Sequence, residues 1–358
     1  MKFLFIASAL ALVGSCSTTK YSTKVQNIKN SIELVDSTLV MKYANSITHN
    51  ELKNHVYTIS DNSFEGRATG EIGQKIAANY IKTFYQKNNI VSPMKDSSYF
   101  QTIPNSFLPN DTKTSENVLA FIKGSEKPDE VVIISAHYDH LGITEDDLIN
   151  NGADDNGSGT SALLEIAQAF KLAEKEGYTP KRSVLFLHVT AEEIGKLGSL
   201  YYTENPVFPL ENTICDLNID MIGRVDESHA NNKKYVYLIG SDKLSHELHY
   251  LSEKVNETYF NMYLDYKYNA EYDSNHYYTR SDHYNFVLKG IPVIFYFNGT
   301  HEDYHKPTDT ADKIDFNLLM TRTKLIFATA WQLANQERRI LIDNGILSTL
   351  NCSILFLI

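Results

Sequence analysis

Four apolar runs of strand length recur along the chain and constrain its fold most strongly. They occupy residues 130–136, 183–189, 214–219 and 292–297. Their apolar residues are continuous rather than alternating, which is typical of strands that are covered on both faces. Helical spacing of apolar positions is found at residues 73–88, 159–174 and 316–338. This alternation predicts an α/β fold, in which a mostly parallel mixed sheet is sandwiched between helices.

The N-terminal residues have the features of an export signal. A short basic start, Met1–Lys2, precedes an apolar run over residues 3–13 that only Ser8 interrupts. Small residues then lead to Cys16, as in a bacterial lipoprotein cleavage site. We therefore expect residues 1–15 to be a lipoprotein signal peptide and Cys16 to carry acyl chains. The alternative is an ordinary signal peptide that happens to lie near a cysteine.

The rest of the chain divides into three parts. Residues 16–44 are expected to form a polar tether and N-terminal segment, and residues 45–340 a single folded domain. Within that domain, residues 225–284 stand apart because they are rich in Tyr and charges. The tail at 341–358 ends in a largely apolar stretch of 13 residues, 346–358, which is too short to span a bilayer. A last helix or strand packed on the domain is the preferred interpretation of this tail.

Composition excludes several classes of protein. The net charge of −11 argues against nucleic acid as the main partner, because phosphate binding favours a basic face. No run of 18 or more apolar residues is present, so no spanning helix is expected and membrane contact would come only through the anchor at Cys16. The three cysteines are too few for a disulfide scaffold, and whether Cys215 pairs with Cys352 stays open.

Acidic and His side chains follow the apolar runs, where each strand is expected to end. Ligand sites in open α/β sheets lie outside the carboxyl ends of the strands. A single such residue would be ordinary polar surface, but these segments coincide at the end of every predicted strand. Nitrogen and oxygen donors without thiolates suit Zn²⁺ in a hydrolytic site. The segments are residues 137–140 (HYDH), 151–159 (NGADDNGSG), 190–193 (TAEE), Asp220 and 301–305 (HEDYH).

These segments, in this order and spacing, resemble the di-zinc aminopeptidase family of zinc exopeptidases. Glutamate carboxypeptidase, glutaminyl cyclase and the transferrin-receptor ectodomain are relatives of that family. The resemblance covers residues 45–338 and implies one zinc peptidase catalytic domain. The matching segments are EGRATG (65–70), SAHYDHLG (135–142), NGADDNGSG (151–159), TAEEIGKLGS (190–199), NIDMIGR (218–224), RSDHYNF (280–286), GIPVI (290–294) and YHKPTDT (304–310).

The resemblance implies two zinc ions per chain and a ligand set. His137 and Asp220 would bind one ion, Glu193 and His305 the other, and Asp155 would bridge them. Such a pair of ions would share a bridged water that attacks the peptide carbonyl. The bond between Asp155 and Asn156 is expected to be cis, as relatives have it.

Three further residues are expected to serve the reaction. The resemblance makes Glu192 the general base, Asp139 the group that holds the His137 ring, and Tyr304 the hydroxyl that stabilises the oxyanion. Asp154 competes for the bridging role but is interpreted as a structural hydrogen-bonding residue. Three other histidines are expected to support the ligands or to lie on the surface: His140, His283 and His301.

The function expected first is removal of N-terminal residues from peptides with a free N-terminus by a zinc aminopeptidase. Glutaminyl cyclisation and carboxypeptidase action on the same fold are alternatives, and a carboxypeptidase would need a cluster of Arg. A non-catalytic surface lipoprotein is the alternative of another class. The expected location is the cell envelope, lipid-anchored to the outer membrane. Eight Tyr between residues 259 and 284 would favour an apolar or aromatic first side chain if they rim the pocket, and the alternative is a Tyr-rich surface lid unrelated to specificity.

Overall fold

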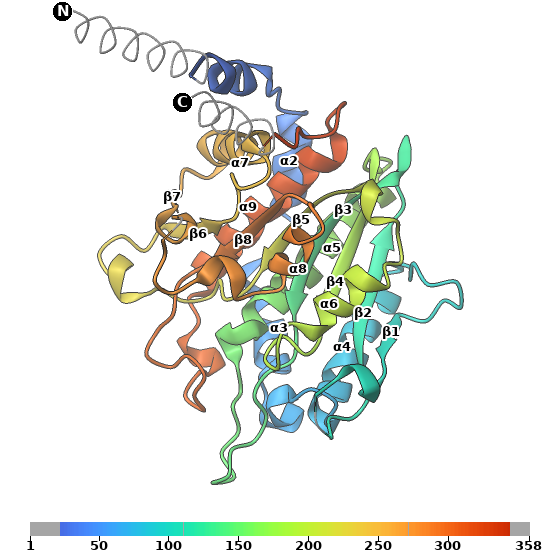
Figure 1. Cartoon of the computed structure of the whole chain (residues 1–358), viewed down its shortest axis with the longest axis vertical. Helices are drawn as coiled ribbons and strands as arrows, with labels where there is room; N and C mark the ends of the chain where they lie inside the picture. Colours follow the sequence, from blue (N-terminus) through green and yellow to red (C-terminus); the bar gives the residue numbers. More distant parts are fainter. Residues whose placement is uncertain (1–21, 110, 271, 344–358) are drawn as a thin grey trace, which may run out of the picture.

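The structure, a computed structural model, describes residues 22–109, 111–270 and 272–343 (Figure 1). The expected signal peptide, Cys16, most of the apolar tail and Cys352 lie outside the described residues. Within them, no helix combines the length and the apolar character needed to cross a membrane.

One eight-stranded mixed sheet organises the described residues, in the order β1-β2-β4-β3-β5-β8-β6-β7. The central strands β4, β3, β5 and β8 are parallel, whereas β1, β2 and β6 join the sheet by antiparallel pairing. The four predicted strands are these central ones, as expected for runs covered on both faces. The strands are β1 (Phe100–Ile103), β2 (Ser115–Ile122), β3 (Lys127–His137), β4 (Arg182–Val189), β5 (Thr213–Ile219), β6 (Tyr235–Ile239), β7 (Tyr263–Asp265) and β8 (Val293–Phe297).

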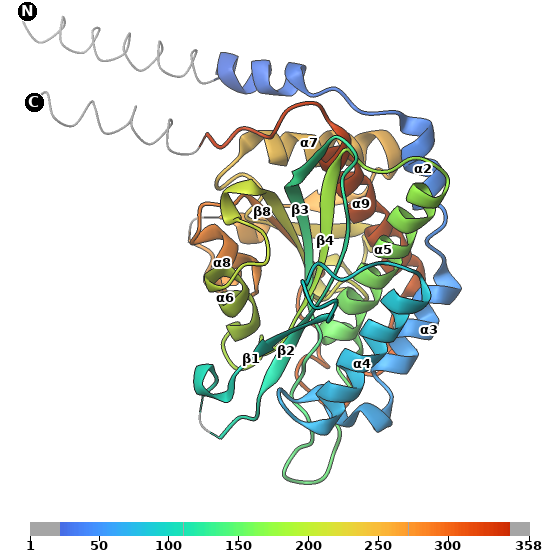
Figure 2. The same ribbon diagram turned by 90° about the vertical axis from the view of Figure 1, so that its right-hand side faces the viewer.

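Helices cover both faces of the sheet, which confirms the predicted sandwich (Figure 2). Helices α3, α4, α5 and α9 pack on one face, and the shorter α6 and α8 on the other. The three predicted helices correspond to α4, α5 and α9. The helices are α2 (Ser37–Ala44), α3 (His49–Ile59), α4 (Ile72–Lys87), α5 (Gly159–Lys175), α6 (Leu197–Glu204), α7 (His246–Tyr259), α8 (His283–Val287) and α9 (Phe316–Asn335).

Strand β5 shows how the two faces of the sheet differ. Leu217 and Ile219 belong to the large apolar core beneath α5 and α9. Asp216 and Asn218 alternate with them and are also fully buried, but successive side chains of a strand point to opposite faces. The polar residues of β5 therefore lie on the α6 and α8 side of the sheet.

The folded body begins earlier than the boundary expected at residue 45. Helix α2 buries Val40, Tyr43 and Ala44 in the same core as α5 and α9. The Tyr43 ring lies 5.4 Å from that of Trp331, and the main-chain amide of Val35 donates to the Gln332 side chain at 2.8 Å. The N-terminal segment that was expected to precede the domain therefore contributes α2 to the core, because its apolar positions have helical spacing.

The segment 225–284, set apart by its composition, is an integral part of the fold. It contributes β6, α7 and β7 to the sheet and to the helical layer. Tyr235 and Tyr237 of β6 are buried, and their hydroxyls donate hydrogen bonds to the carboxylate of Asp226. Tyr residues here act as strand-forming core residues, which a count of Tyr and charges does not reveal.

Candidate metal centre

Five segments bring the proposed ligands together at the carboxyl ends of the central strands. His137 ends β3, Asp220 directly follows β5, and Glu193 lies in the turn after β4. His305 is in the loop after β8, and Asp155 is in the turn Ala153–Ser158 that leads into α5. All the predicted ligands therefore meet at one edge of the sheet, as the parallel arrangement requires.

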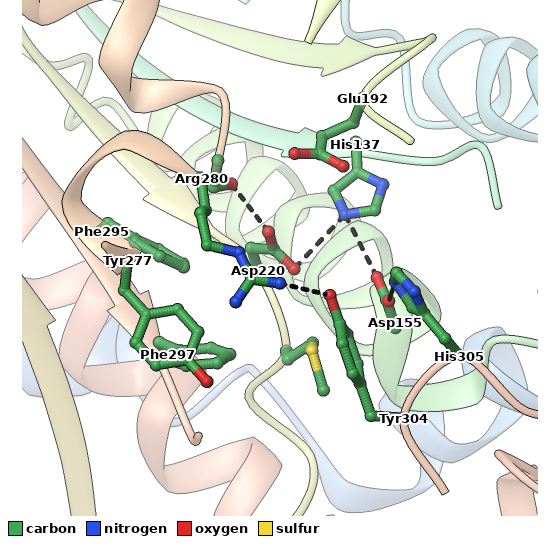
Figure 3. A pocket seen from close by; sticks show the side chains of 12 residues that line it. His137, Asp155, Glu192, Asp220, Tyr277, Arg280, Phe295, Phe297, Tyr304 and His305 are labelled. Carbon is green, nitrogen blue, oxygen red and sulfur yellow. Dashed lines mark hydrogen bonds and ion pairs between the residues drawn. The ribbon is translucent and has the colours of Figure 1, made fainter. Parts of the chain in front are cut away.

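One group of donors surrounds His137 (Figure 3). Its Nε2 lies 3.3 Å from Oδ1 of Asp155 and 3.3 Å from Oδ1 of Asp220. Donor atoms from these three residues all lie within 4.8 Å of one another. His137 and Asp155 are almost completely buried. This spacing suits ligands that surround a single cation.

A second group of donors uses the other oxygen of Asp155. Nε2 of His305 lies 3.1 Å from Oδ2 of Asp155 and 3.3 Å from Oε2 of Glu193. The two oxygens of Asp155 thus face two different sets of donors. A carboxylate in this position can bridge two cations. The Asp155–Asn156 peptide bond is cis, as expected.

Glu192 and Glu193 are adjacent but lie in opposite electrostatic environments. Burial, reinforced by the charges of Asp282 and Glu193, raises the pKa of Glu192 well above its usual range. Burial and Asp155 oppose ionisation of Glu193 as well, yet hydrogen bonds with His140 and His305 lower the pKa of Glu193. Two carboxylates whose pKa values are pushed apart in this way suit two different chemical roles.

The structure places Asp139 differently from the expectation that its carboxylate holds the His137 ring. Nδ1 of His137 donates to the main-chain carbonyl of Asp139 at 3.2 Å, whereas the carboxylate Oδ1 is 3.8 Å away. The carboxylate instead accepts from the amide N–H groups of Glu192 and Glu193, at 3.2 and 3.4 Å, and from the Thr69 hydroxyl at 2.9 Å. Asp139 therefore supports both sides of the site, with its main chain at the ring and its side chain at the Glu192–Glu193 turn.

Tyr304 lies beside the two groups of donors and faces the pocket in front of them. Its ring stacks on His305 with centroids 3.8 Å apart, and its hydroxyl accepts from Arg280 at 3.3 Å. Burial, together with the charges of Asp155 and Asp220, raises the pKa of Tyr304 far above its usual value. The hydroxyl therefore stays protonated and can donate to an anionic oxygen.

The pocket has an apolar side opposite the donors, formed by Tyr277, Phe295 and Phe297, and Met221 also lines the pocket. Of the eight Tyr between residues 259 and 284, Tyr277 lines the pocket, while Tyr266 and Tyr268 pack against other aromatic rings of the fold. The Tyr-rich stretch thus contributes one ring to the site, and β8 contributes Phe295 and Phe297.

The remaining candidates support the donors or lie apart from them. Nδ1 of His140 lies 2.7 Å from Oε1 of Glu193 and 3.9 Å from Oδ2 of Asp155, so this buried ring could also meet a cation at the second group of donors. Asp154 accepts from the Gly223 amide at 2.7 Å and faces Nε2 of His301 at 3.1 Å. His283 is buried and donates to the Tyr278 carbonyl at 2.9 Å.

Three residues that complete the site were not singled out from the sequence. Arg67 is completely buried and donates to the carbonyls of Ile59, Tyr138, Asn151 and Gly152. Thr69 contacts Asp139, and Ser281 donates to Oδ2 of Asp220 at 2.7 Å. Arg67 and Thr69 belong to the EGRATG segment and Ser281 to RSDHYNF, so their presence in those motifs was the available signal.

The donor set fits zinc. It consists of imidazole nitrogens and carboxylate oxygens, which are ordinary ligands of Zn²⁺. The negative charges of Asp155, Asp220 and Glu193 are buried close together, and hydrogen bonds from His137 and His305 keep the pKa of Asp155 well below its usual range although burial opposes this. Bound cations would replace the protons that these histidines share with the carboxylates.

Sequence comparison places the chain in a known class of enzymes. Residues 117–330 match the model of Peptidase family M28, and the chain belongs to this family. It is 27% identical over 273 residues to a probable zinc metalloprotease of Pyricularia oryzae, covering 65% of this chain and 53% of that protein. It is 30% identical over 257 residues to leupeptin-inactivating enzyme 1 of Streptomyces exfoliatus, and the match covers 72% of this chain and 49% of that protein. The chain thus spans about half the length of these two relatives.

Solved structures share the fold. The zinc aminopeptidase BSAP of Bacillus subtilis superposes with a TM-score of 0.62 at 16% identity, covering 83% of this chain and 98% of that one. The LapA aminopeptidase of Legionella pneumophila gives a TM-score of 0.65 at 20% identity, and the match covers 86% of this chain and 77% of that one. The mixed sheet between two helical layers is therefore an arrangement that solved structures contain.

Proposed function

We propose that this chain is a zinc aminopeptidase that binds two zinc ions and releases N-terminal residues from peptides. The observation that carries the proposal is the position of Asp155, whose two oxygens face His137 and Asp220 on one side and His305 and Glu193 on the other. Membership of Peptidase family M28 and the aminopeptidase names of relatives support it. Bound zinc ions would lower the pKa of a water molecule and polarise the peptide carbonyl.

The protein's own residues supply the proton transfer and the charge stabilisation. Glu192 lines the pocket, and its raised pKa suits a base that accepts a proton from the attacking water and delivers it to the leaving amine. The Tyr304 hydroxyl lies across the pocket and can donate to the oxygen on which negative charge develops. Asp139 holds the amides of the turn that carries Glu192, which fixes the base relative to His137.

The charge of the pocket favours an aminopeptidase over a carboxypeptidase. A substrate α-ammonium is a cation and fits a site rich in carboxylates, whereas a terminal carboxylate would require several Arg. Arg280 lines the pocket, but Arg224 is held by Asp303 at 2.9 Å. Glutaminyl cyclisation is a single-zinc reaction, and the full double donor set argues against it.

Metal removal provides the first test. Dialysis against a chelator should abolish release of a chromogenic amine from aminoacyl substrates, because the carboxylates alone cannot polarise the carbonyl, and added Zn²⁺ should restore it. The zinc content of the restored protein should reach two per chain. An N-acetylated form of the same substrate is the control and should not be cleaved. Chelator-resistant turnover, or release from the C-terminus, would contradict the proposal.

The apolar side of the pocket predicts a preference for large apolar first residues. Phe297→Ala should lower kcat/KM for leucyl and phenylalanyl substrates by about 10-fold to 100-fold, because burial of such a side chain contributes about 1.5–3 kcal/mol. The kcat/KM for an alanyl substrate should change much less, since a methyl group does not reach this wall. Tyr263→Ala, on an exposed ring outside the pocket, is the matched control. Equal losses of kcat/KM for all substrates would show that Phe297 does not contact the side chain of the substrate's first residue.

We propose further that the enzyme is exported and lipid-anchored at Cys16, on the outer membrane. Cys16→Ala should leave the chain unprocessed or mislocalised, because the acyl chains are the expected means of attachment. A form of the chain that begins at Asn30 should be soluble and fully active, since it retains α2 and every residue of the site. Cell fractionation and turnover of the two variants check this. Normal membrane attachment of Cys16→Ala would exclude the anchor.

A further inference from the structure

A row of buried polar side chains runs along β5 towards the metal centre. Asp216 and Asn218 of β5 and Asp220, the residue directly after it, alternate in sequence and therefore share the face that α6 and α8 cover. Ser135 on the neighbouring strand β3 pairs with Asn218 across the ladder, and Ser281 lies between Asn218 and Asp220. All but Asp220 are at most 1% exposed, and Asp220 is 9% exposed. The row therefore connects the interior of the sheet with a ligand at the pocket.

Four contacts join these side chains end to end. Oγ of Ser135 lies 2.7 Å from Oδ1 of Asp216 and 3.0 Å from Oδ1 of Asn218. Nδ2 of Asn218 donates to Oγ of Ser281 at 2.9 Å. Ser281 donates to Oδ2 of Asp220 at 2.7 Å, while Oδ1 of Asp220 faces His137. Each contact has the length of an ordinary hydrogen bond.

The members between the two carboxyl groups cannot supply a hydrogen to every contact. Each hydroxyl has one hydrogen, and the amide directs one N–H towards Ser281, so three hydrogens serve four contacts. If the Asn218 amide were turned round, its N–H would point at Ser135 and its oxygen at Ser281, and three hydrogens would still serve four contacts. The fourth hydrogen must therefore lie on one of the two terminal carboxyl groups, Asp216 or Asp220.

The environments of Asp216 and Asp220 show which of the two carboxyl groups carries the fourth hydrogen. Oδ1 of Asp220 lies 3.3 Å from Nε2 of His137 and its Oδ2 lies 2.7 Å from Oγ of Ser281, so both oxygens of an ionised Asp220 face a possible donor. Asp216 is completely buried, and its Oδ2 has no hydrogen-bond partner among the described residues. An ionised carboxylate in this position would leave a charge uncompensated, which is more costly than a neutral acid.

We infer that Asp216 is a neutral carboxylic acid that donates to Ser135 and thereby fixes the direction of a hydrogen-bond chain ending on Asp220. Ser135 then donates to Asn218, Asn218 to Ser281, and Ser281 to Oδ2 of Asp220. Oδ1 of Asp220 then remains available to bind a cation. Ser281 and Asn218 are thus positioning residues for a metal ligand, and Asp216 sets their orientation. The link to zinc rests on the proposed function, but the protonation of Asp216 does not.

The electrostatics of this part of the protein agree with a neutral acid. Burial raises the pKa of Asp216 well above its usual range, which the Ser135 hydroxyl counteracts and the charge of Asp282 reinforces. Asp216 lies close enough to Tyr202 of α6 and to Cys215 to act on both electrostatically, and both of these groups are themselves completely buried. Apolar sites are known to keep a carboxylic acid neutral at pH 7 so that it can donate a hydrogen bond.

Infrared difference spectroscopy of the metal-free protein tests the protonation directly. The spectrum of Asp216→Asn subtracted from that of the native protein should show the carbonyl stretch of a carboxylic acid and no carboxylate bands. Asp146→Asn, at an exposed position, is the control and should show carboxylate bands only. Loss of carboxylate bands in Asp216→Asn would overturn the inference. Should that variant not fold, Ser135→Ala should shift the acid carbonyl band, because Asp216 loses its acceptor, and the absence of any such shift would be equally contradictory.

Zinc affinity, measured by competition with a chromophoric chelator, tests the function of the hydrogen-bond chain. Ser281→Ala should weaken binding about 10-fold to 100-fold, the usual effect of removing a hydrogen bond to a ligand. Asp216→Asn should leave the dissociation constant unchanged, because its amide still donates to Ser135. Unchanged zinc affinity in Ser281→Ala would contradict the positioning role. A native protein that binds no zinc would instead contradict the proposed function and leave the infrared result intact.

Discussion

Glu192→Gln is expected to lower kcat by about 10²–10⁴-fold while both of the proposed zinc ions stay bound. Gln is almost the same shape as Glu, so the fold should not change, but its amide cannot accept a proton. Glu192 contacts neither oxygen of Asp155, although its carboxylate lies close to His137 and Glu193, and its environment raises its pKa. Steady-state kinetics and metal analysis on the same preparation measure both effects.

Glu193→Gln is the matched comparison, because it makes the same chemical change one residue further on. Oε2 of Glu193 lies in the second group of donors and Oε1 contacts His140. This variant should therefore lose zinc from one site, and excess Zn²⁺ should restore part of its activity. The opposite pattern, with metal lost in Glu192→Gln and kept in Glu193→Gln, would exchange the two roles. Near-normal turnover of Glu192→Gln with both ions bound would remove Glu192 as the base.

The parts of the fold and site that could be predicted depend on local signals. Strands β3, β4, β5 and β8 are buried on both faces, so each appears as an uninterrupted apolar run. Because these strands are parallel, the polar residues after each run had to meet at one edge. Motifs with a fixed order supplied the identity of His137, Asp155 and Asp220. The positions of these residues in space then follow from the topology.

The parts that could not be predicted depend on contacts between distant segments. Strand β6 is made of Tyr, Val, Leu and Ile, and lies in a stretch whose charges conceal it. Helix α2 becomes part of the core only because α5 and α9 offer a surface for Tyr43. The carboxylate of Asp139 accepts from the amides of the turn after β4, and Asp139 is 53 residues away in sequence from Glu192 in that turn. No sequence pattern specifies such a preference over the nearby His137 ring.

Asp155→Asn is expected to remove both zinc ions and to reduce kcat/KM by at least about 10³-fold, since metal polarisation of a substrate is worth several kcal/mol. One side chain faces both groups of donors, so its loss affects two sites at once. An amide offers a single neutral oxygen and cannot bridge two cations. Metal analysis after dialysis, together with turnover of an aminoacyl substrate, measures both losses.

Asp154→Asn is the control, because it changes the neighbouring carboxylate of the same turn. Asp154 accepts from the Gly223 amide and faces His301, and within the part of the chain that the structure describes it has no side-chain contact with either group of donors. Its substitution should lower the free energy of unfolding by about 1–3 kcal/mol, because a buried charged hydrogen bond is weakened, while both zinc ions remain. If Asp154→Asn lost the metal and Asp155→Asn kept it, the bridging role would belong to Asp154. If both variants kept two zinc ions, no single carboxylate of this turn would bridge them, and the two-ion site would have to rest on the His and Glu ligands alone.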